Sequence, residues 1–502
     1  MQPCQIGDST LFSCIGAGIV RSFPMRPLIA FFTFLFLLSP AAADETRPNI
    51  LWIYVDDMSD WMGCYGDDTV ATPHIDSLAE EGILFENAHM PSPVCSSTRS
   101  ALITGTMQTT HGLHRHRTMV KKPLPEGVVA IPSLFLKAGY TTFNEEKEDY
   151  NFTYNREDLY SADFERPKMR GHLVGNDVSF LEQLQGKPFF GQIQLKGGKI
   201  GGESGSKYPA ESRIDEADVR VPAHYPDTPV IRNAIARHYE QVAQTDEQVG
   251  AILAGLKEYG LWENTIVFFF TDHGSPLPRS KQFLYEEGTK VPLIVRFPES
   301  MDAPADPGTV RKDLVNGIDI SATTLALAGL KIPESVEGKN VFAEGYREQT
   351  HLITARDRCG IAVDRIRSVR TERFRYLRNS LNDRALYQSQ YRDKFATLVE
   401  LRKQHAAGEL SAVQASYHEA GQRPEEELYD LQNDPDQVTN LASDPAFADE
   451  LKRHRKLLEA WIAETGDQGQ APENEEELRL VYEGAKGKVE SPEYDFLKTG
   501  EK

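Results

Sequence analysis

Apolar residues gather in short continuous runs at two points of the chain. NILWIYV (residues 49–55) ends at a pair of aspartates, and NTIVFFF (residues 264–270) ends at Thr-Asp-His-Gly. Runs of this length without polar alternation predict strands buried on both faces, as in a parallel sheet covered by helices. Residues 74–82 and 239–260 have helical spacing and end in glycine. The alternation predicts an α/β protein, an αβα sandwich with a large, mostly parallel sheet.

The pattern changes near residue 365. IRSVRTERFRYLRN (residues 366–379) predicts one arginine-rich strand, and helical segments follow it. We expect a large domain over residues 44–364, a smaller C-terminal α+β domain over 365–466, and a polar, loosely packed tail over 467–502. Six arginines here are interpreted as strand and surface charges rather than substrate ligands: Arg365, Arg367, Arg370, Arg373, Arg375 and Arg378. The alternative is that one or two of them line the cleft, if the C-terminal domain packs over it.

A strongly apolar segment precedes the large domain. Its apolar core, Leu28 to Leu38, is too short to span a bilayer as a helix. Three alanines follow at residues 41–43, as at a signal cleavage site. Residues 1–43 are therefore predicted to be a secretory signal of an exported protein without a transmembrane anchor. A compact signal begins at Met25, which is the expected start of translation.

Cleavage leaves three cysteines, Cys64, Cys95 and Cys359, which can form at most one disulfide. PSPVCSSTRSALITG (residues 91–105) places Cys95 at the start of a helix-like run, with Arg99 one turn further on. This pattern fits a nucleophile at a helix N-terminus, and it fits a buried cysteine beside an ordinary helix cap equally well.

The net charge of −20 argues against nucleic acid as a partner. Residues 87–125 differ from this average because they hold no Asp or Glu, and they include a basic segment, Arg115–Lys122. A basic patch beside a candidate nucleophile favours an anionic substrate, whereas the alternative is a solvated surface loop. Three histidines are either acid–base candidates or part of a polar loop: His111, His114 and His116.

Carboxylates stand at the ends of both apolar strands. Asp56 and Asp57 follow the first strand, and Asp272 follows the second, with His273 next to it. Ligands bind beyond the carboxyl ends of parallel strands, so these side chains should meet there. A divalent cation removes the cost of burying such carboxylates together, and oxygen ligands suit Ca²⁺ or Mg²⁺. Asp56 or Asp57 alone could simply cap the next helix, but their combination with Asp272 and His273 predicts a metal site.

These segments resemble the sulfatase family. CSSTRSALITG is similar to the family signature, in which a cysteine and an arginine four residues later precede a turn that ends in Thr-Gly. Similar segments run in collinear order from about residue 47 to 445: RPNILWIYVDD, GYTTFNEEK, NTIVFFFTDHG, LPRSKQFLYEEGTKVPLIVRFP, GIDISATTLALAGLKIP and ELYDLQNDPDQVTNLA. The resemblance implies an alkaline-phosphatase-like fold and hydrolysis of sulfate esters.

The resemblance also implies roles for single residues. Cys95 is similar to the cysteine that a maturation enzyme oxidises to formylglycine, whose hydrated aldehyde is the nucleophile. Arg99 resembles the arginine that steadies this nucleophile, and Lys147 and Lys281 resemble the lysines that grip the sulfate. One calcium ion is implied, with these ligands: Asp56, Asp57, Cys95, Asp272 and His273.

Three positions depart from the family pattern. Ser97 stands where proline or alanine is usual, and Asp149 stands where a histidine often follows the first lysine. Lys199 replaces a histidine expected as proton donor. With shifted pKa values, Asp149 could serve as a base, and Lys199 could serve as an acid or instead bind the sulfate. These departures concern the proton transfers and leave the nucleophile and the metal ligands unchanged.

The sequence thus predicts an exported, calcium-dependent sulfatase whose substrate is a sulfated saccharide. A phosphomonoester or phosphonate-ester hydrolase on the same fold is the enzymatic alternative. A catalytically silent protein that binds sulfated glycans is the alternative from another class, and the replacements at Asp149 and Lys199 keep it open.

Overall fold

The computed structural model describes residues 47–165, 177–200 and 213–498. The expected signal segment, with its start at Met25, lies outside these residues. Residues 46–502 form one compact unit. In the part of the chain that the structure describes, no helix has both the length and the apolar character needed to cross a membrane.

A seven-stranded sheet forms the centre of this unit, in the order β4-β6-β1-β7-β8-β2-β9. Only β8 runs antiparallel to its neighbours β7 and β2, whereas the other adjacent strands pair in parallel. The predicted α/β class with a mostly parallel sheet is confirmed. The strands are β1 (Asn49–Val55), β2 (Gly82–His89), β4 (Thr141–Asn144), β6 (Phe189–Leu195), β7 (Thr265–Thr271), β8 (Lys290–Arg296) and β9 (Thr309–Asn316).

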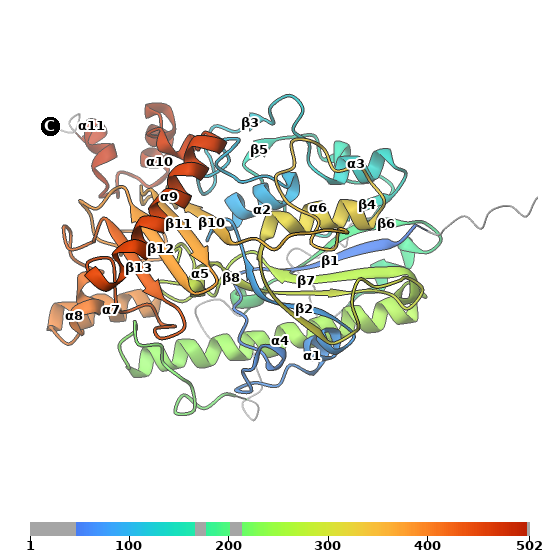
Figure 1. Ribbon diagram of the computed structural model, residues 1–502, viewed down its shortest axis with the longest axis horizontal. Helices are drawn as coiled ribbons and strands as arrows, with labels where there is room; N and C mark the ends of the chain where they lie inside the picture. The colour runs from blue at the N-terminus through green and yellow to red at the C-terminus, as the bar shows by residue number, and fades with distance from the viewer. Residues whose placement is uncertain (1–46, 166–176, 201–212, 499–502) are drawn as a thin grey trace, which may run out of the picture. The chain divides into compact units, whose positions relative to one another are not determined.

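Side chains of β1 alternate between two hydrophobic cores, one on each face of the sheet. Leu51, Ile53 and Val55 pack with α1 and α4, while Trp52 and Tyr54 pack with α2, α3 and α6. Figure 1 shows α1 and α4 on one side of the sheet and α2 and α6 on the other. The helices are α1 (Pro73–Glu80), α2 (Cys95–Thr104), α3 (Pro132–Lys137), α4 (Pro229–Glu258), α5 (Glu286–Thr289) and α6 (Gly317–Leu327).

Helix α4 begins ten residues before the helix predicted over 239–260. The side chain of Thr228 accepts a hydrogen bond from the Ile231 amide, and proline occupies the first helical position. These are strong start signals for a helix. The irregular segment before the helix therefore ends at Thr228, and residues 201–212 lie outside the described ones.

A smaller antiparallel sheet follows, in the order β10-β11-β12-β13. The segment predicted as one arginine-rich strand forms two, β11 and β12, which pair as a hairpin. Glu372 and Arg373 form its turn. The strands are β10 (His351–Arg356), β11 (Ile366–Thr371), β12 (Phe374–Asn379) and β13 (Glu426–Asp430), while β3 (Lys122–Pro123) and β5 (Phe152–Thr153) form a separate pair.

Three arginines of this hairpin are buried, which corrects their expected surface position. Arg367 pairs with Asp357 and Asp467, and Arg370 and Arg375 both contact Glu286. Buried guanidinium groups require such partners because an unpaired charge is costly to desolvate.

The tail is also better ordered than expected. Leu478, Val481 and Tyr494 are buried in a hydrophobic cluster, so residues 467–498 pack against the rest of the unit. The C-terminal helices are α7 (Ala396–Ala407), α8 (Ala412–Ser416), α9 (Ala448–Thr465), α10 (Glu475–Gly484) and α11 (Asp495–Lys498).

Candidate active site

The site lies where β1 and β7 end side by side. Val55 pairs with Thr271 in the parallel register, so the aspartates that follow each strand emerge together. Asp57 adopts a left-handed backbone conformation with φ of 54°, and its amide donates to Asp272 Oδ1 over 3.0 Å. The predicted meeting of these carboxylates is confirmed.

Cys95 is the first residue of α2, and its side chain is buried at this edge of the sheet. Its Sγ lies 3.3 Å from His273 Nε2 and 3.5 Å from Lys281 Nζ. Both Asp57 Oδ1 and Lys199 Nζ lie 3.9 Å from the same sulfur. The partial positive charge of the α2 N-terminus acts at this position too. The structure therefore puts Cys95 in a cationic, carboxylate-lined centre.

Arg99, one helical turn after Cys95, joins the two strand ends. Its guanidinium contacts Asp56 and Asp272 at 3.2 Å each and donates to Gln194 over 2.7 Å. It also lies over the ring of Tyr54, 4.3 Å from the centroid, in a cation–π contact. These contacts fix α2 relative to β1, β6 and β7.

Three lysines surround the carboxylates. Lys147 Nζ lies 2.7 Å from Asp56, Lys199 Nζ contacts Asp56 at 2.7 Å and Asp57 at 3.2 Å, and Lys281 Nζ lies 2.6 Å from Asp57. Burial opposes ionisation of the Cys95 thiol, but the charges of Lys147, Lys199 and Lys281 outweigh it and hold the thiol pKa well below its usual value.

Two glycines bring Lys199 to this position. A Cβ on Gly197 would lie 2.3 Å from the Asp56 carbonyl oxygen, and one on Gly198 would lie 2.0 Å from that of Asp57. Only a residue without a side chain allows the short helix η4 (Gly197–Lys199) to lie against this backbone. The Gly198 amide donates to the Asp56 carbonyl over 3.0 Å.

Four side chains are arranged as metal ligands. One donor atom each from Asp57, Cys95, Asp272 and His273 lies within 4.8 Å of the others, and all four residues are buried. His273 Nδ1 donates to the Gly274 carbonyl, so Nε2, which lies 3.2 Å from Asp57 Oδ1, is the ring nitrogen that can bind a metal. Burial and the charge of Asp56 raise the pKa of Asp272, so a cation here would relieve an unfavourable buried charge. This donor set fits a divalent ion.

The remaining predicted residues lie around this centre. Asp56 is held by Arg99 and the lysines and is not one of those four donors. Asp149 has φ of 50° and faces Lys147 and Arg117, at 3.9 and 3.4 Å, rather than Cys95. The buried Ser97 hydroxyl donates to the His114 carbonyl over 3.0 Å.

The histidines of the predicted polar loop differ in burial. His114 and His116 are buried, whereas His111 is partly exposed. His116 lies against the thiols of Cys359 and Cys95. No disulfide joins Cys64, Cys95 or Cys359.

Sequence reasoning missed Tyr54 and Gln194. Both are polar residues inside apolar strands that end at this edge, in NILWIYV and FFGQIQL. A polar side chain at such a position is the signal that could have identified them.

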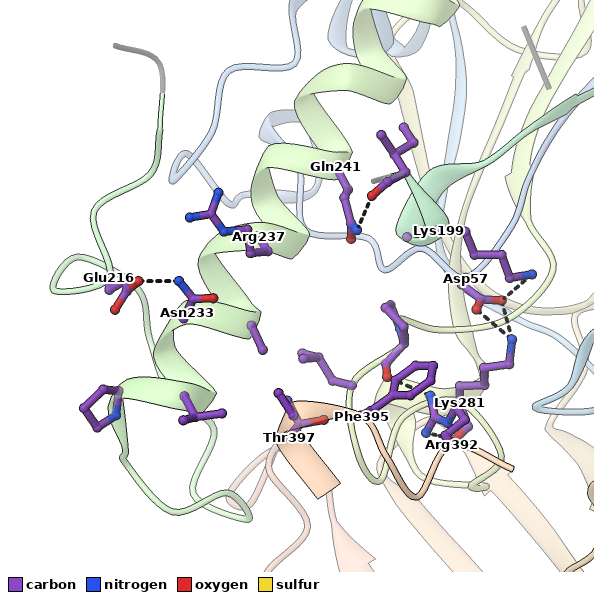
Figure 2. Close-up of a pocket in the computed structure, with 18 of the residues that line it drawn as sticks. Asp57, Lys199, Glu216, Asn233, Arg237, Gln241, Lys281, Arg392, Phe395 and Thr397 are labelled. Atoms are coloured by element: carbon purple, nitrogen blue, oxygen red, sulfur yellow. Dashed lines mark hydrogen bonds and ion pairs between the residues drawn. The ribbon is translucent and has the colours of Figure 1, made fainter. Parts of the chain in front are cut away.

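A cavity of about 1120 Å³ opens beside the cluster. Asp57, Lys199 and Lys281 form its inner end, and Figure 2 shows α4 with Asn233 and Arg237 on one wall and the segment that carries Arg392 and Phe395 on another. Five basic residues and two acidic ones line it: Lys199, Arg213, Arg237, Lys281 and Arg392, with Asp57 and Glu216. In a protein with a net charge of −20, this cavity is suited to an anion.

The sequence is similar to those of known sulfatases. The family model described as Sulfatase matches residues 48–330, and one described as N-sulphoglucosamine sulphohydrolase, C-terminal, matches residues 279–394. An ulvan-active sulfatase of Formosa agariphila is 31% identical over 469 residues, covering 86% of this chain and 77% of that protein. Human N-sulphoglucosamine sulphohydrolase is 29% identical over 479 residues, covering 84% and 91%.

A solved structure shows the same fold. The 2-O GAG sulfatase BT1596 superposes with a TM-score of 0.57 at 21% identity, covering 85% of this chain and 94% of that one. The chain belongs to the sulfatase family. It is a sulfuric ester hydrolase.

Proposed function

We propose that this protein is an exported, calcium-dependent sulfatase that removes sulfate groups from a carbohydrate through formylglycine at position 95. The observation that carries the proposal is the position of Cys95 Sγ, 3.5 Å from Lys281 and within 4.8 Å of three candidate metal ligands. The large cationic cavity and the names of the two relatives, an ulvan-active sulfatase and an N-sulphoglucosamine sulphohydrolase, support a saccharide substrate.

The residues of the cluster would bind and orient the sulfate group. Lys147, Lys199 and Lys281 would donate to its oxygens, and the N-terminus of α2 would direct amide groups at the same charge. Negative charge grows on the bridging oxygen as the S–O bond breaks, so fixed cations at this position lower the barrier. Arg99 is a positioning residue in this scheme because it contacts Asp56 and Asp272 rather than the cavity.

Calcium would be held by the four clustered donors, Asp57, Asp272, His273 and the side chain of residue 95, and by Asp56 once the ion displaces its lysine contacts. There it would orient the sulfate and favour a deprotonated nucleophile. Each lysine contacts a carboxylate directly. A calcium ion bound to the carboxylates and a sulfate ester bound to the lysines would replace these pairs.

Formylglycine would supply a hydrated aldehyde whose second hydroxyl allows sulfate to be expelled without attack of water on sulfur. A maturation enzyme must then oxidise Cys95. The buried, hydrogen-bonded Ser97 occupies little space next to this residue, which is consistent with acceptance of the variant signature.

Turnover of 4-nitrophenyl sulfate tests the proposal. We expect hydrolysis of the sulfate well above that of 4-nitrophenyl phosphate, loss of this activity in EDTA, and recovery with Ca²⁺. An ion that binds only the folded state stabilises it, so EDTA should also lower the melting temperature. Mass spectrometry of a peptide spanning Ala88 to Arg99, from protein made in its native cell, should show formylglycine at position 95.

Other outcomes select the alternatives. Faster phosphate hydrolysis would indicate a phosphoester hydrolase, and no turnover of either ester would indicate a glycan-binding protein. Insensitivity of both rate and melting temperature to EDTA would exclude the calcium site. Active protein that contains only unmodified Cys95 would exclude formylglycine.

A further inference from the structure

One wall of the cavity has chemistry that hydrolysis of a single sulfate group does not use. The volume of the cavity, about 1120 Å³, slightly exceeds the usual range for small-molecule sites, roughly 300–1,000 Å³. Part of its wall is a short segment with Tyr391, Arg392, Phe395, Ala396 and Thr397. Figure 2 shows Arg392 beside Lys281 of the cluster.

Arg392 is a buried cation without an acidic partner. Its side chain is only 2% exposed although it lines the cavity. Its terminal nitrogens donate to the carbonyls of Pro276 and Lys281 at 2.7 and 3.5 Å, and its Nε has no hydrogen-bond partner. Arg392 forms no ion pair within the described ranges, and the neighbouring Asp393 bonds to Arg402 instead. A buried guanidinium of this kind favours an anion from outside the chain.

A second feature of the same wall also favours an anion. Helix α7, of 12 residues, begins at Ala396 with no side-chain cap on its N-terminus. Phe395, Ala396 and Thr397 line the cavity, so the positive end of the helix dipole lies at the cavity wall. Free amides at a helix N-terminus bind oxyanions.

Tyr391 gives this wall an apolar surface. It is 41% exposed, an unusual position for a large aromatic residue in this chain, and its ring lies 5.6 Å from that of His116. An exposed aromatic face beside a cation can pack against the apolar face of a sugar while the cation binds its charged substituent.

We propose that Tyr391, Arg392 and the N-terminus of α7 form a subsite for a sugar linked to the sulfated one, and that this second sugar carries an oxyanion. The oxyanion is a uronate carboxylate or a second sulfate. The subsite rests on the proposed sulfatase function, and it adds that the substrate is an acidic saccharide of at least two sugars.

Paired substitutions at the exposed Ala396 test the subsite. Ala396→Asp places a negative charge in the first turn of α7, where it also favours the helix, and Ala396→Asn has the same shape without the charge. The measurement is inhibition of 4-nitrophenyl sulfate hydrolysis by disaccharides whose sulfated glucosamine is linked to glucose, to glucuronate or to a sulfated hexose. The last two distinguish a carboxylate from a sulfate.

We expect the acidic disaccharides to inhibit the wild type at least tenfold more strongly than the neutral one. Ala396→Asp should abolish this preference and Ala396→Asn should retain it, with less than twofold change for the neutral disaccharide. Arg392→Gln should also abolish the preference for acidic disaccharides. Lys403→Gln, on an exposed part of α7, should retain this preference.

Two outcomes overturn the subsite: equal inhibition of the wild type by neutral and acidic disaccharides, or equal behaviour of the Asp and Asn variants. Failure of the sulfatase proposal is separate, because it appears as no hydrolysis of 4-nitrophenyl sulfate by the wild type. In that event calorimetric binding of the same disaccharides to the same variants still decides whether the subsite exists.

Discussion

Lys199 is the residue whose role the geometry narrows most. The sequence suggested a proton donor to the leaving alcohol or a sulfate ligand. Its Nζ lies 3.9 Å from Cys95 Sγ and bonds to Asp56, on the side of the cluster that holds the nucleophile. A proton donor must reach the bridging oxygen, which leaves on the side opposite the nucleophile. This position favours sulfate binding.

We therefore expect Lys199→Ala to lower kcat/KM by about 10²-fold, the usual effect of removing one charge-stabilising donor, for aryl sulfates of every leaving-group pKa. Lys196→Ala, in the same segment, is the matched control and should change the rate little. A loss that grows with leaving-group pKa would instead identify Lys199 as the acid. Full activity of the variant would remove it from the site.

Among single residues of the site, the sequence predicted those that are brought together by neighbouring strand ends or by helical spacing. Asp57 and Asp272 meet because β1 and β7 are neighbours, and Arg99 contacts Asp272 because it lies one turn after Cys95. Asp149 is oriented toward Arg117 by a left-handed backbone conformation, which the pattern of residues in the sequence does not predict. The cavity wall around Arg392 has no regular spacing from the motifs, so only the fold reveals it.

At the scale of elements, a buried ion cluster links the small sheet to the segment that carries Lys281. Glu286, the first residue of α5, contacts Arg370 on β11 at 3.0 Å and Arg375 on β12 at 2.6 Å. Burial opposes ionisation of Glu286, but the two arginines outweigh it and hold its pKa well below the usual value. The sequence predicted the arginines as strand residues but not their partner.

Glu286→Gln leaves two buried guanidinium groups without a carboxylate, so we expect the free energy of unfolding to fall by about 3 kcal/mol. Glu459→Gln is the control, because it breaks an exposed contact of Arg378, which lies on β12 with Arg375. It should lower the free energy of unfolding by less than about 1 kcal/mol. Urea unfolding near pH 7 measures both.

The pH dependence follows from the lowered pKa of Glu286. Glu286 has a pKa of roughly 4.3 in the unfolded chain and a lower pKa in the folded protein. The stability that its contacts with the two arginines contribute is therefore fully present above pH 4.3, and it is lost as the pH falls through the folded pKa. The difference between wild type and Glu286→Gln should therefore shrink on acidification. A difference that is independent of pH, or equal for both variants, would contradict the assignment.

At the scale of the molecule, the αβα architecture was predictable because its buried strands lack polar alternation. The hairpin of β11 and β12 was not, since its turn, Glu372-Arg373, contains no Gly, Pro, Asn or Asp to mark it. The packed tail escaped prediction because the cluster that buries its apolar residues, such as Leu478, also needs residues from far along the chain, such as Val363.

Export is the prediction that concerns the whole chain. We expect N-terminal sequencing of the secreted protein to begin at Asp44, since the alanines at 41–43 fit signal cleavage. A chain that starts translation at Met25 should be secreted equally well. A mature protein that still contains Leu35 would contradict the signal.

The residues of the cluster lie far apart in the sequence, and this affects when activity appears during folding. Asp57 and Asp272 are 215 positions apart, and Cys95 and Lys281 are 186 apart. Contacts of such long range form late and slowly in folding. During synthesis, no nascent chain shorter than 281 residues contains the complete cluster. After dilution from denaturant, activity should therefore return only when the strands of the central sheet have paired. The time course of regained activity would then measure the rate of this last folding step.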